Sequence, residues 1–190
     1  MLATDRPRIT FEEYCQIEAD SPVKHEYLDG QAWAMAGGSR EHAALCANVL
    51  GILTAQLRGG RCQAHTSDLR IRIRATGLTT YPDVSVICGH AEIDPDDRLG
   101  HTVVNPTLLV EVLSPSTADY DRGEKLEQYQ RIESLREVVL VDQTERSIEV
   151  WRRADTGDWA STQYGEGAAT LASISATLAL EDVYRDPLSE

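Results

Sequence analysis

The pattern of hydrophobic and polar positions along the chain predicts three helices before the C-terminal tail. A short helix is expected from Thr10 to about Ala19, because Thr10 and Glu13 form a capping box. The longest helical pattern runs from Ser39 to Arg58, and another runs from Asp121 to Glu133. The apolar stripe of the longest helix consists of Cys46, Val49, Leu50, Leu53 and Leu57, with His42 one turn earlier.

Other segments predict strands. Asp29-Gly30 readily supplies the positive φ angles of a two-residue turn, so residues 25–28 and 31–35 are expected to pair as a β-hairpin. Residues 68–74 alternate with a period of two, which is typical of a half-buried strand. The alternation places Leu69, Ile71 and Ile73 on one face and Arg70, Arg72 and Arg74 on the other.

Two short apolar runs, residues 81–88 and 107–114, are typical of central strands that are covered on both faces. Two more strands are expected at residues 137–142 and 147–152, and the tail is expected to add a strand and a short helix. The acidic stretch at residues 89–105 predicts an exposed loop.

Length and composition agree with one folded domain. The 190 residues are 42% hydrophobic, enough to bury a real core, and no repeat or linker divides them. We therefore predict a single α/β domain over residues 1–190, with a mixed central sheet flanked by helices. No apolar run approaches the roughly 20 residues that cross a bilayer, and residues 1–10 lack the apolar core of a signal peptide. The expectation is a cytoplasmic protein with no membrane partner.

The charge excludes one mode of nucleic-acid binding and leaves another open. The 18 basic and 31 acidic residues give a net charge of −13, which rules out a polycation that coats nucleic acid by charge alone. Residues 58–74 nevertheless hold five arginines and one aspartate. Arg70, Arg72 and Arg74 would present three guanidinium groups to DNA phosphates, or they would form a solvated face that pairs with acids elsewhere.

The four cysteines are scattered along the chain. Cys15, Cys46, Cys62 and Cys88 include no C-x-x-C pair, so neither a zinc cluster nor a disulfide framework has the expected spacing. We predict reduced, buried thiols. A Cys–His nucleophile stays formally open, but no local pattern singles out one thiol.

Glu111 carries the main chemical signal. It lies within Leu108-Leu-Val-Glu-Val-Leu113, where a strand surrounds it with apolar neighbours, and a buried carboxylate needs a cation, a metal or several donors. Asp83 poses the same problem near the start of another core strand. Two acids on neighbouring strands can share one Mg²⁺ through oxygen ligands. Alternatively, each acid caps a turn or pairs with an arginine.

Lys125 lies on the helix that follows Glu111. It shares a helix face with Leu126 and Tyr129, so its stem is expected to point toward the sheet. From there its ammonium can reach a site near Glu111 and orient a water or neutralise a developing phosphate charge. The alternative is a lysine that extends to solvent beside Asp121.

Together these segments resemble a known family. In chain order they are His25-Glu-Tyr-Leu-Asp-Gly30, Ser39-Arg-Glu-His42, Tyr81-Pro-Asp-Val84, Val110-Glu-Val-Leu-Ser-Pro-Ser-Thr117 and Asp121-Arg-Gly-Glu-Lys125 followed by Tyr129. Over nearly the whole chain they are similar to the Uma-two family of restriction-endonuclease-like proteins, in the PD-(D/E)xK nuclease-like superfamily. The resemblance implies a mixed sheet flanked by helices and Mg²⁺-dependent hydrolysis of phosphodiester bonds in DNA, with Mn²⁺ as the alternative ion.

The resemblance also implies roles for individual residues. It makes Asp83 and Glu111 the metal ligands and Glu26 an additional catalytic acid, although a glutamate in a hairpin is otherwise expected to be a solvated charge. In the simplest pattern of the superfamily a lysine lies two residues after the second acid. That position is Leu113 here, so Lys125 is expected to supply the cation.

Two further residues would support such a site. Tyr129 would position Lys125, although a buried aromatic is more often a core residue. His42 would contact a phosphate, although a histidine on an apolar stripe is more often part of a core. The resemblance also implies a homodimer. Leu113 instead favours a degenerate nuclease fold that binds nucleic acid or protein, and a third alternative is an acidic interaction protein without a metal.

Overall fold

The computed structural model describes residues 8–35 and 37–186. The helical segments are α1 (Phe11–Asp20), α2 (Arg40–Leu57), α3 (Ala118–Tyr120), the π-helical η1 (Asp121–Lys125), α4 (Leu126–Tyr129), the 3-10 turn η2 (Ala172–Ile174) and α5 (Leu180–Val183). The strands are β1 (His25–Leu28), β2 (Gln31–Ala34), β3 (Cys62–Thr66), β4 (Arg70–Arg72), β5 (Thr79–Thr80), β6 (Val84–Cys88), β7 (Thr102–Val103), β8 (Leu108–Leu113), β9 (Glu137–Asp142), β10 (Ile148–Arg153), β11 (Trp159–Tyr164), β12 (Ala168–Leu171) and β13 (Ala176–Ala179). The architecture is the predicted α/β arrangement of a mixed sheet flanked by helices.

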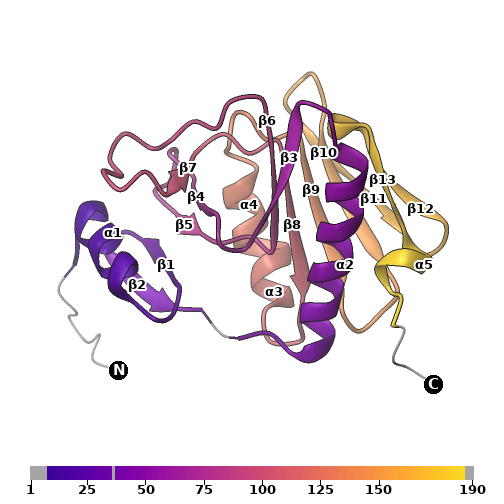
Figure 1. Ribbon diagram of the computed structural model, residues 1–190, viewed down its shortest axis with the longest axis horizontal. Coiled ribbons are helices and arrows are strands. Elements are labelled where there is room, and N and C mark those ends of the chain that lie inside the picture. Colours follow the sequence, from indigo (N-terminus) through magenta and orange to yellow (C-terminus); the bar gives the residue numbers. More distant parts are fainter. Residues whose placement is uncertain (1–7, 36, 187–190) are drawn as a thin grey trace.

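The main sheet has six strands in the order β11-β10-β9-β8-β6-β3, and only its β8–β9 pair is parallel. Helix α2 and the β12–β13 hairpin cover one face, while α4 and strands of a smaller sheet cover the other (Figure 1). Strand β8 is buried along its whole length. Val110 and Val112 belong to the core on the α2 side, and Leu109 and Leu113 belong to the core on the α4 side. The alternation therefore directs Glu111 toward α4.

The smaller sheet has the order β2-β1-β5-β4-β7 and carries the N-terminal hairpin. Asp29 and Gly30 form the expected turn, both with positive φ. Thr10 caps α1 as predicted, with Glu13 completing the capping box. The Tyr14 hydroxyl donates a hydrogen bond of 2.6 Å to the His25 carbonyl, which joins α1 to β1.

The helical segment after β8 differs from the predicted helix over residues 121–133. It begins at Ala118, widens into a π-helix over Asp121–Lys125 and ends at Tyr129. Residues 130–132 continue as hydrogen-bonded turns. Single π-helical turns inside helices are frequent at functional sites. Here the π-helical turn contains two buried charged residues, Asp121 and Lys125.

The arginine trio does not form the exposed basic face that alternation predicts. Arg70 is buried, and its Nη2 atom lies 2.9 Å from Asp97 Oδ2. Arg72 pairs with Asp94, and Arg74 lies 3.7 Å from the same carboxylate with its side chain 53% exposed. The expectation of an exposed loop at residues 89–105 is correspondingly wrong at Asp94 and Asp97, which are buried because the loop folds back onto β4.

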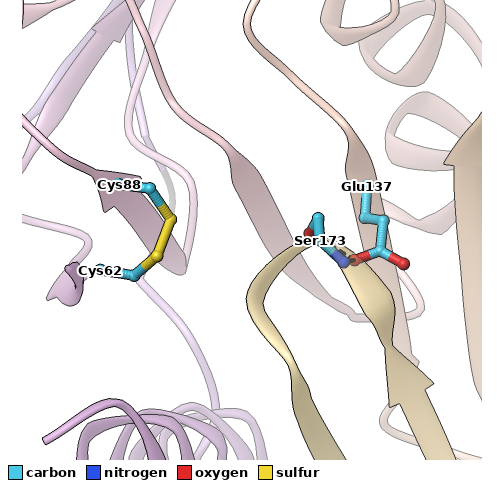
Figure 2. Close-up of a disulfide and its surroundings, with 4 residues drawn as sticks. All are labelled: Cys62, Cys88, Glu137 and Ser173. Atoms are coloured by element: carbon cyan, nitrogen blue, oxygen red, sulfur yellow. Dashed lines mark hydrogen bonds between the residues drawn. A yellow bond between two sulfur atoms is a disulfide. The ribbon is translucent and has the colours of Figure 1, made fainter. Parts of the chain in front are cut away.

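The prediction of four reduced thiols is wrong at two positions. Figure 2 shows a disulfide between Cys62 and Cys88. The antiparallel β3–β6 register places these residues directly opposite each other, with their Cα atoms 3.9 Å apart. Cys15 and Cys46 are free, Cys15 buried and Cys46 partly buried.

Glu137 illustrates how the β12–β13 region attaches to the main sheet. Figure 2 shows its carboxylate beside Ser173, which donates hydrogen bonds to it from both its backbone amide and its hydroxyl. Arg152 pairs with the other oxygen of the same carboxylate at 2.8 Å. This buried acid therefore has a structural explanation. Within the described residues, no helix has the length and hydrophobicity needed to span a membrane.

Candidate functional site

A cleft of about 520 Å³ lies where the N-terminal hairpin, the start of α2, the ends of β6 and β8, and the π-helical turn meet. Its lining includes all four residues expected to be catalytic, which are Glu26, Asp83, Glu111 and Lys125. His42 and Asp121 also line it. Its volume is in the range typical of ligand sites. The structure thus brings together residues that are up to 99 positions apart in the sequence.

Lys125 is the positive centre of the cleft. Its Nζ atom lies 3.0 Å from Glu111 Oε1, and 3.5 Å from both Glu26 Oε1 and Asp121 Oδ1. All four side chains are at least 93% buried. The expectation that Lys125 points toward the sheet is confirmed, and the alternative of a solvated lysine is not what the structure shows.

Glu111 reaches this cluster from β8. The Tyr129 hydroxyl donates a hydrogen bond to Glu111 Oε1, the same oxygen that contacts Lys125. Tyr129 is fully buried, and the Lys125 Nζ atom lies 5.9 Å from the centre of its ring. Tyr129 thus contacts both members of the pair: its hydroxyl binds the acid, and its ring faces the ammonium.

The charges of this pair follow from burial and neighbours. Burial raises the pKa of Glu111 to about 8; the Lys125 ammonium opposes this shift, and the Asp83 and Asp121 carboxylates reinforce it. Burial lowers the pKa of Lys125, but Glu111, Tyr129 and Glu26 outweigh burial and hold that pKa well above its ordinary value. Lys125 therefore stays charged, and Glu111 binds a proton more readily than an exposed glutamate.

Glu26 is buried, although a hairpin position alone predicts a solvated charge. Its Oε1 atom accepts a hydrogen bond from the Thr80 hydroxyl, and its Oε2 atom accepts one of 3.2 Å from Trp33 Nε1. Pairing of β1 with β5 brings Thr80 to this position. The burial of Glu26 depends on the small sheet, which no local pattern around the hairpin reveals.

Asp83 lies directly before β6 and is 17% exposed. Its Oδ2 atom accepts a hydrogen bond of 2.8 Å from the Val112 amide of β8. His42 Nε2, from the first turn of α2, lies 3.3 Å from the same oxygen. The hydrogen bond to Asp83 is the main cause that raises the pKa of His42. His42 is therefore a partner of Asp83 and not simply a core residue.

Asp121 is a site residue that sequence reasoning treated only as a helix partner of Lys125. Its i,i+4 spacing to Lys125 was the available signal. The structure adds that Asp121 is buried and lines the cleft. Carboxylates from three separate elements, β1, β8 and η1, thus surround one ammonium.

The mixed sheet flanked by helices is the architecture of the restriction-endonuclease-like folds. Here one acid lies directly before β6, a second lies within the adjacent strand β8, and a lysine lies beside the second acid. The family model of Uma2, described as "Putative restriction endonuclease", matches residues 11–183. The chain belongs to this family. The structure is similar to a crystal structure of "a putative nuclease belonging to DUF820" from Anabaena variabilis, with a TM-score of 0.72, 17% sequence identity, and coverage of 93% of this chain and 97% of that one.

Two proteins of Synechocystis sp. are similar over most of their length. One, "Uncharacterized protein slr1290", is 40% identical over 181 residues, which cover 94% of this chain and 93% of the relative. The other, "Uncharacterized protein sll1609", is 31% identical over 169 residues, which cover 88% of this chain and 94% of the relative. The family and the structural neighbour support a nuclease-like function.

Proposed function

We propose that the protein is a Mg²⁺-dependent endonuclease that hydrolyses phosphodiester bonds in DNA, with Mn²⁺ as the alternative ion. One observation carries the proposal: a buried ammonium is held among three carboxylates in a cleft that also contains Asp83. Buried charged groups with strongly shifted pKa values, gathered in a cleft, are a feature of functional sites. Membership of the family adds the nuclease class.

The donors of the cleft fit a hard divalent cation. Carboxylate oxygens are the ligands that Mg²⁺ prefers and that Mn²⁺ also accepts. Asp83 offers such oxygens from the position directly before β6, and Glu111 offers them from the adjacent strand β8. We assign these two residues as the metal ligands. When bound, the ion supplies Lewis-acid polarisation of the phosphate and lowers the pKa of a coordinated water.

The remaining residues prepare the site for developing negative charge. Lys125 stabilises that charge on the phosphate, and its three carboxylate contacts fix the position of the ammonium in advance. Tyr129 holds Glu111, and Glu26 helps to hold Lys125. Because Glu111 has a raised pKa, a divalent ion must displace its proton, so we expect metal binding to strengthen from pH 6 to pH 9.

Contacts to the DNA backbone need cations that are exposed to solvent. Of the arginine trio, only Arg74 has a side chain exposed by half or more. Arg58 and Arg61 are exposed and form no ion pair within the described part of the chain, and both line a second cleft of about 540 Å³. We assign the phosphate contacts to Arg58, Arg61 and Arg74, in place of the full trio.

Cleavage of supercoiled plasmid, duplex DNA and single-stranded DNA with Mg²⁺ or Mn²⁺ tests the function. The wild type should cut at least one of these substrates, and Asp83→Asn and Glu111→Gln should each lower the rate by at least a hundredfold. Glu166→Gln, at an exposed residue outside the cleft, should leave the rate unchanged. Equal behaviour of all four proteins on every substrate would end the nuclease proposal.

One observation favours a second candidate, a degenerate nuclease fold that binds nucleic acid without cutting it. Lys125 already neutralises carboxylates that would otherwise be free for a metal, and the usual lysine position is occupied by Leu113. This candidate predicts DNA binding that EDTA does not affect and no cleavage with either ion. The cleavage assay with a parallel binding measurement separates the two.

A further inference from the structure

A second group of ligating side chains includes Asp83 and is separate from the contacts of Lys125. It consists of His42 and Cys46 on α2, together with Asp83 itself. One ligand atom from each of the three lies within 4.8 Å of the others. We propose that this group binds a second metal ion of the borderline-soft type, Zn²⁺ or a close relative, in addition to the hard cation of the proposed nuclease site.

The first two ligands are set by the helix. His42 and Cys46 are four residues apart, so they lie one turn apart on the same face of α2. The distance from Cys46 Sγ to His42 Nδ1 is 3.5 Å. With Zn–S bonds of about 2.3 Å and Zn–N bonds of about 2.0 Å, two ligands of one tetrahedral ion lie about 3.5 Å apart.

The third ligand is supplied by the sheet. Leu45, Val49 and Leu53 pack α2 against the main sheet, which brings the first turn of the helix to the start of β6. The other ring nitrogen, His42 Nε2, lies 3.3 Å from Asp83 Oδ2. Only one of the two nitrogens would bind the ion, and with one ligand atom from each residue the three atoms lie within 4.8 Å of one another. An imidazole, a thiol and a carboxylate are the three kinds of ligand that zinc uses in proteins.

Two features of the surroundings suit a bound ion. Gly38 leaves the space that the imidazole occupies, because a Cβ atom there would lie 2.6 Å from His42 Nδ1. His42 and Asp83 also line the cleft, so the fourth coordination position would face solvent. Three protein ligands and an open position are the arrangement of a zinc site that exchanges water or substrate.

The choice of ion follows from the donors. A thiolate and an imidazole are soft or borderline ligands that favour Zn²⁺ or Co²⁺, whereas the carboxylates around Lys125 favour Mg²⁺. Binding would release the Cys46 proton to solvent, since the thiolate is the ligand. The new site shares Asp83 with the proposed nuclease site but does not depend on nuclease activity, because its remaining ligands do not contact Lys125.

Cobalt supplies a direct test, because a cysteine thiolate bound to Co²⁺ gives a sulfur-to-metal absorption band. Titration of the metal-free, full-length protein with CoCl₂ should produce this band with one equivalent of ion, and ZnCl₂ should remove it while a thousandfold excess of MgCl₂ should not. Cys46→Ser should abolish the band. Cys15→Ser, which removes the other free thiol at a buried position in a separate core cluster, should keep it.

Further variants keep the result decisive. His42→Gln should weaken Co²⁺ binding at least tenfold, and circular dichroism checks that each variant folds. Glu111→Gln should keep the cobalt band while it loses cleavage, so failure of the nuclease proposal and failure of this one are distinguishable. A wild type without a sulfur band, or a band that survives Cys46→Ser, would overturn the second metal site.

Discussion

Removal of the Lys125 ammonium tests the buried charge cluster most directly. We expect Lys125→Met to keep the volume and the apolar stem while it leaves Glu26, Glu111 and Asp121 without their shared cation. Breaking a buried ion pair by removal of one partner costs about 3–5 kcal/mol. Lys24→Met is the matched control, because Lys24 forms its ion pair with Asp68 at the surface. The control should cost at most about 1 kcal/mol.

The cost should depend on pH in a defined direction. The folded-state pKa of Glu111 is raised to about 8 from an ordinary value of 4.5, so folded Glu111 keeps a proton that the unfolded chain loses. The stability that this bound proton contributes is fully present below pH 4.5 and is lost as the pH rises through 8. Without Lys125 this pKa rises further, because the ammonium is the group that opposes the shift. The difference between Lys125→Met and wild type should therefore be larger at pH 9 than at pH 5.

Urea unfolding followed by circular dichroism, with EDTA present, measures both effects. The free energy of unfolding at pH 5 and pH 9 gives the two differences for Lys125→Met and for Lys24→Met. A Lys125 variant that loses no more stability than its control at pH 9 would show that the ammonium does not compensate the acids. If Lys125→Met lost the same amount of unfolding free energy at pH 5 as at pH 9, Glu111 would not be the group whose protonation sets the pH dependence.

Three further predictions concern other parts of the molecule. Asp97 has a folded-state pKa of about 2, because its hydrogen bonds with Thr102 and Arg70 outweigh the effect of burial. Asp97→Asn should therefore lower the free energy of unfolding by about 2 kcal/mol at pH 7, as measured by urea unfolding, and this difference should fade as the pH drops from 4 to 2. The control Asp96→Asn, at an exposed residue, should have almost no effect. Arg58→Glu combined with Arg61→Glu should lower the affinity for DNA at least tenfold, as measured by fluorescence anisotropy. The slope of the logarithm of the DNA association constant against the logarithm of salt concentration should fall in magnitude by about 2. An unchanged slope would show that these arginines do not contact DNA phosphates. Reduction of the β3–β6 disulfide should lower the free energy of unfolding by about 3.5 kcal/mol, given its sequence separation of 26 residues. Equal melting temperatures with and without reductant would contradict this.

The parts of the fold that sequence predicts well are those with strong local rules. The Thr10 capping box and the Asp29-Gly30 turn need only neighbouring residues, and both are confirmed. The burial of Glu111 also follows from local pattern, because an acid within a continuous apolar strand has no route to solvent. The direction of Lys125 follows from helical spacing in the same way.

Other features depend on contacts between distant segments. The disulfide requires the register of β3 against β6, which sets Cys62 opposite Cys88 and is not encoded in the spacing of either cysteine. Arg70 becomes buried because a later loop folds back and brings Asp97, which is 27 residues further along the chain, into contact with it. Glu26 is buried by Thr80 and Trp33, whose positions depend on the assembled small sheet. Period-two alternation assigns faces, but it does not say which face another segment will cover.

The position of Leu113 has a consequence for where the fold can carry its lysine. Leu113 is 1% exposed and belongs to the apolar core on the α4 side, two residues after Glu111. A mutation that places a lysine there would bury an ammonium among aliphatic side chains while Lys125 still occupies the acids. Loss of Lys125 first would leave those acids unpaired. Either single substitution is expected to destabilise the fold, so moving the lysine from the helix to the strand requires both changes together.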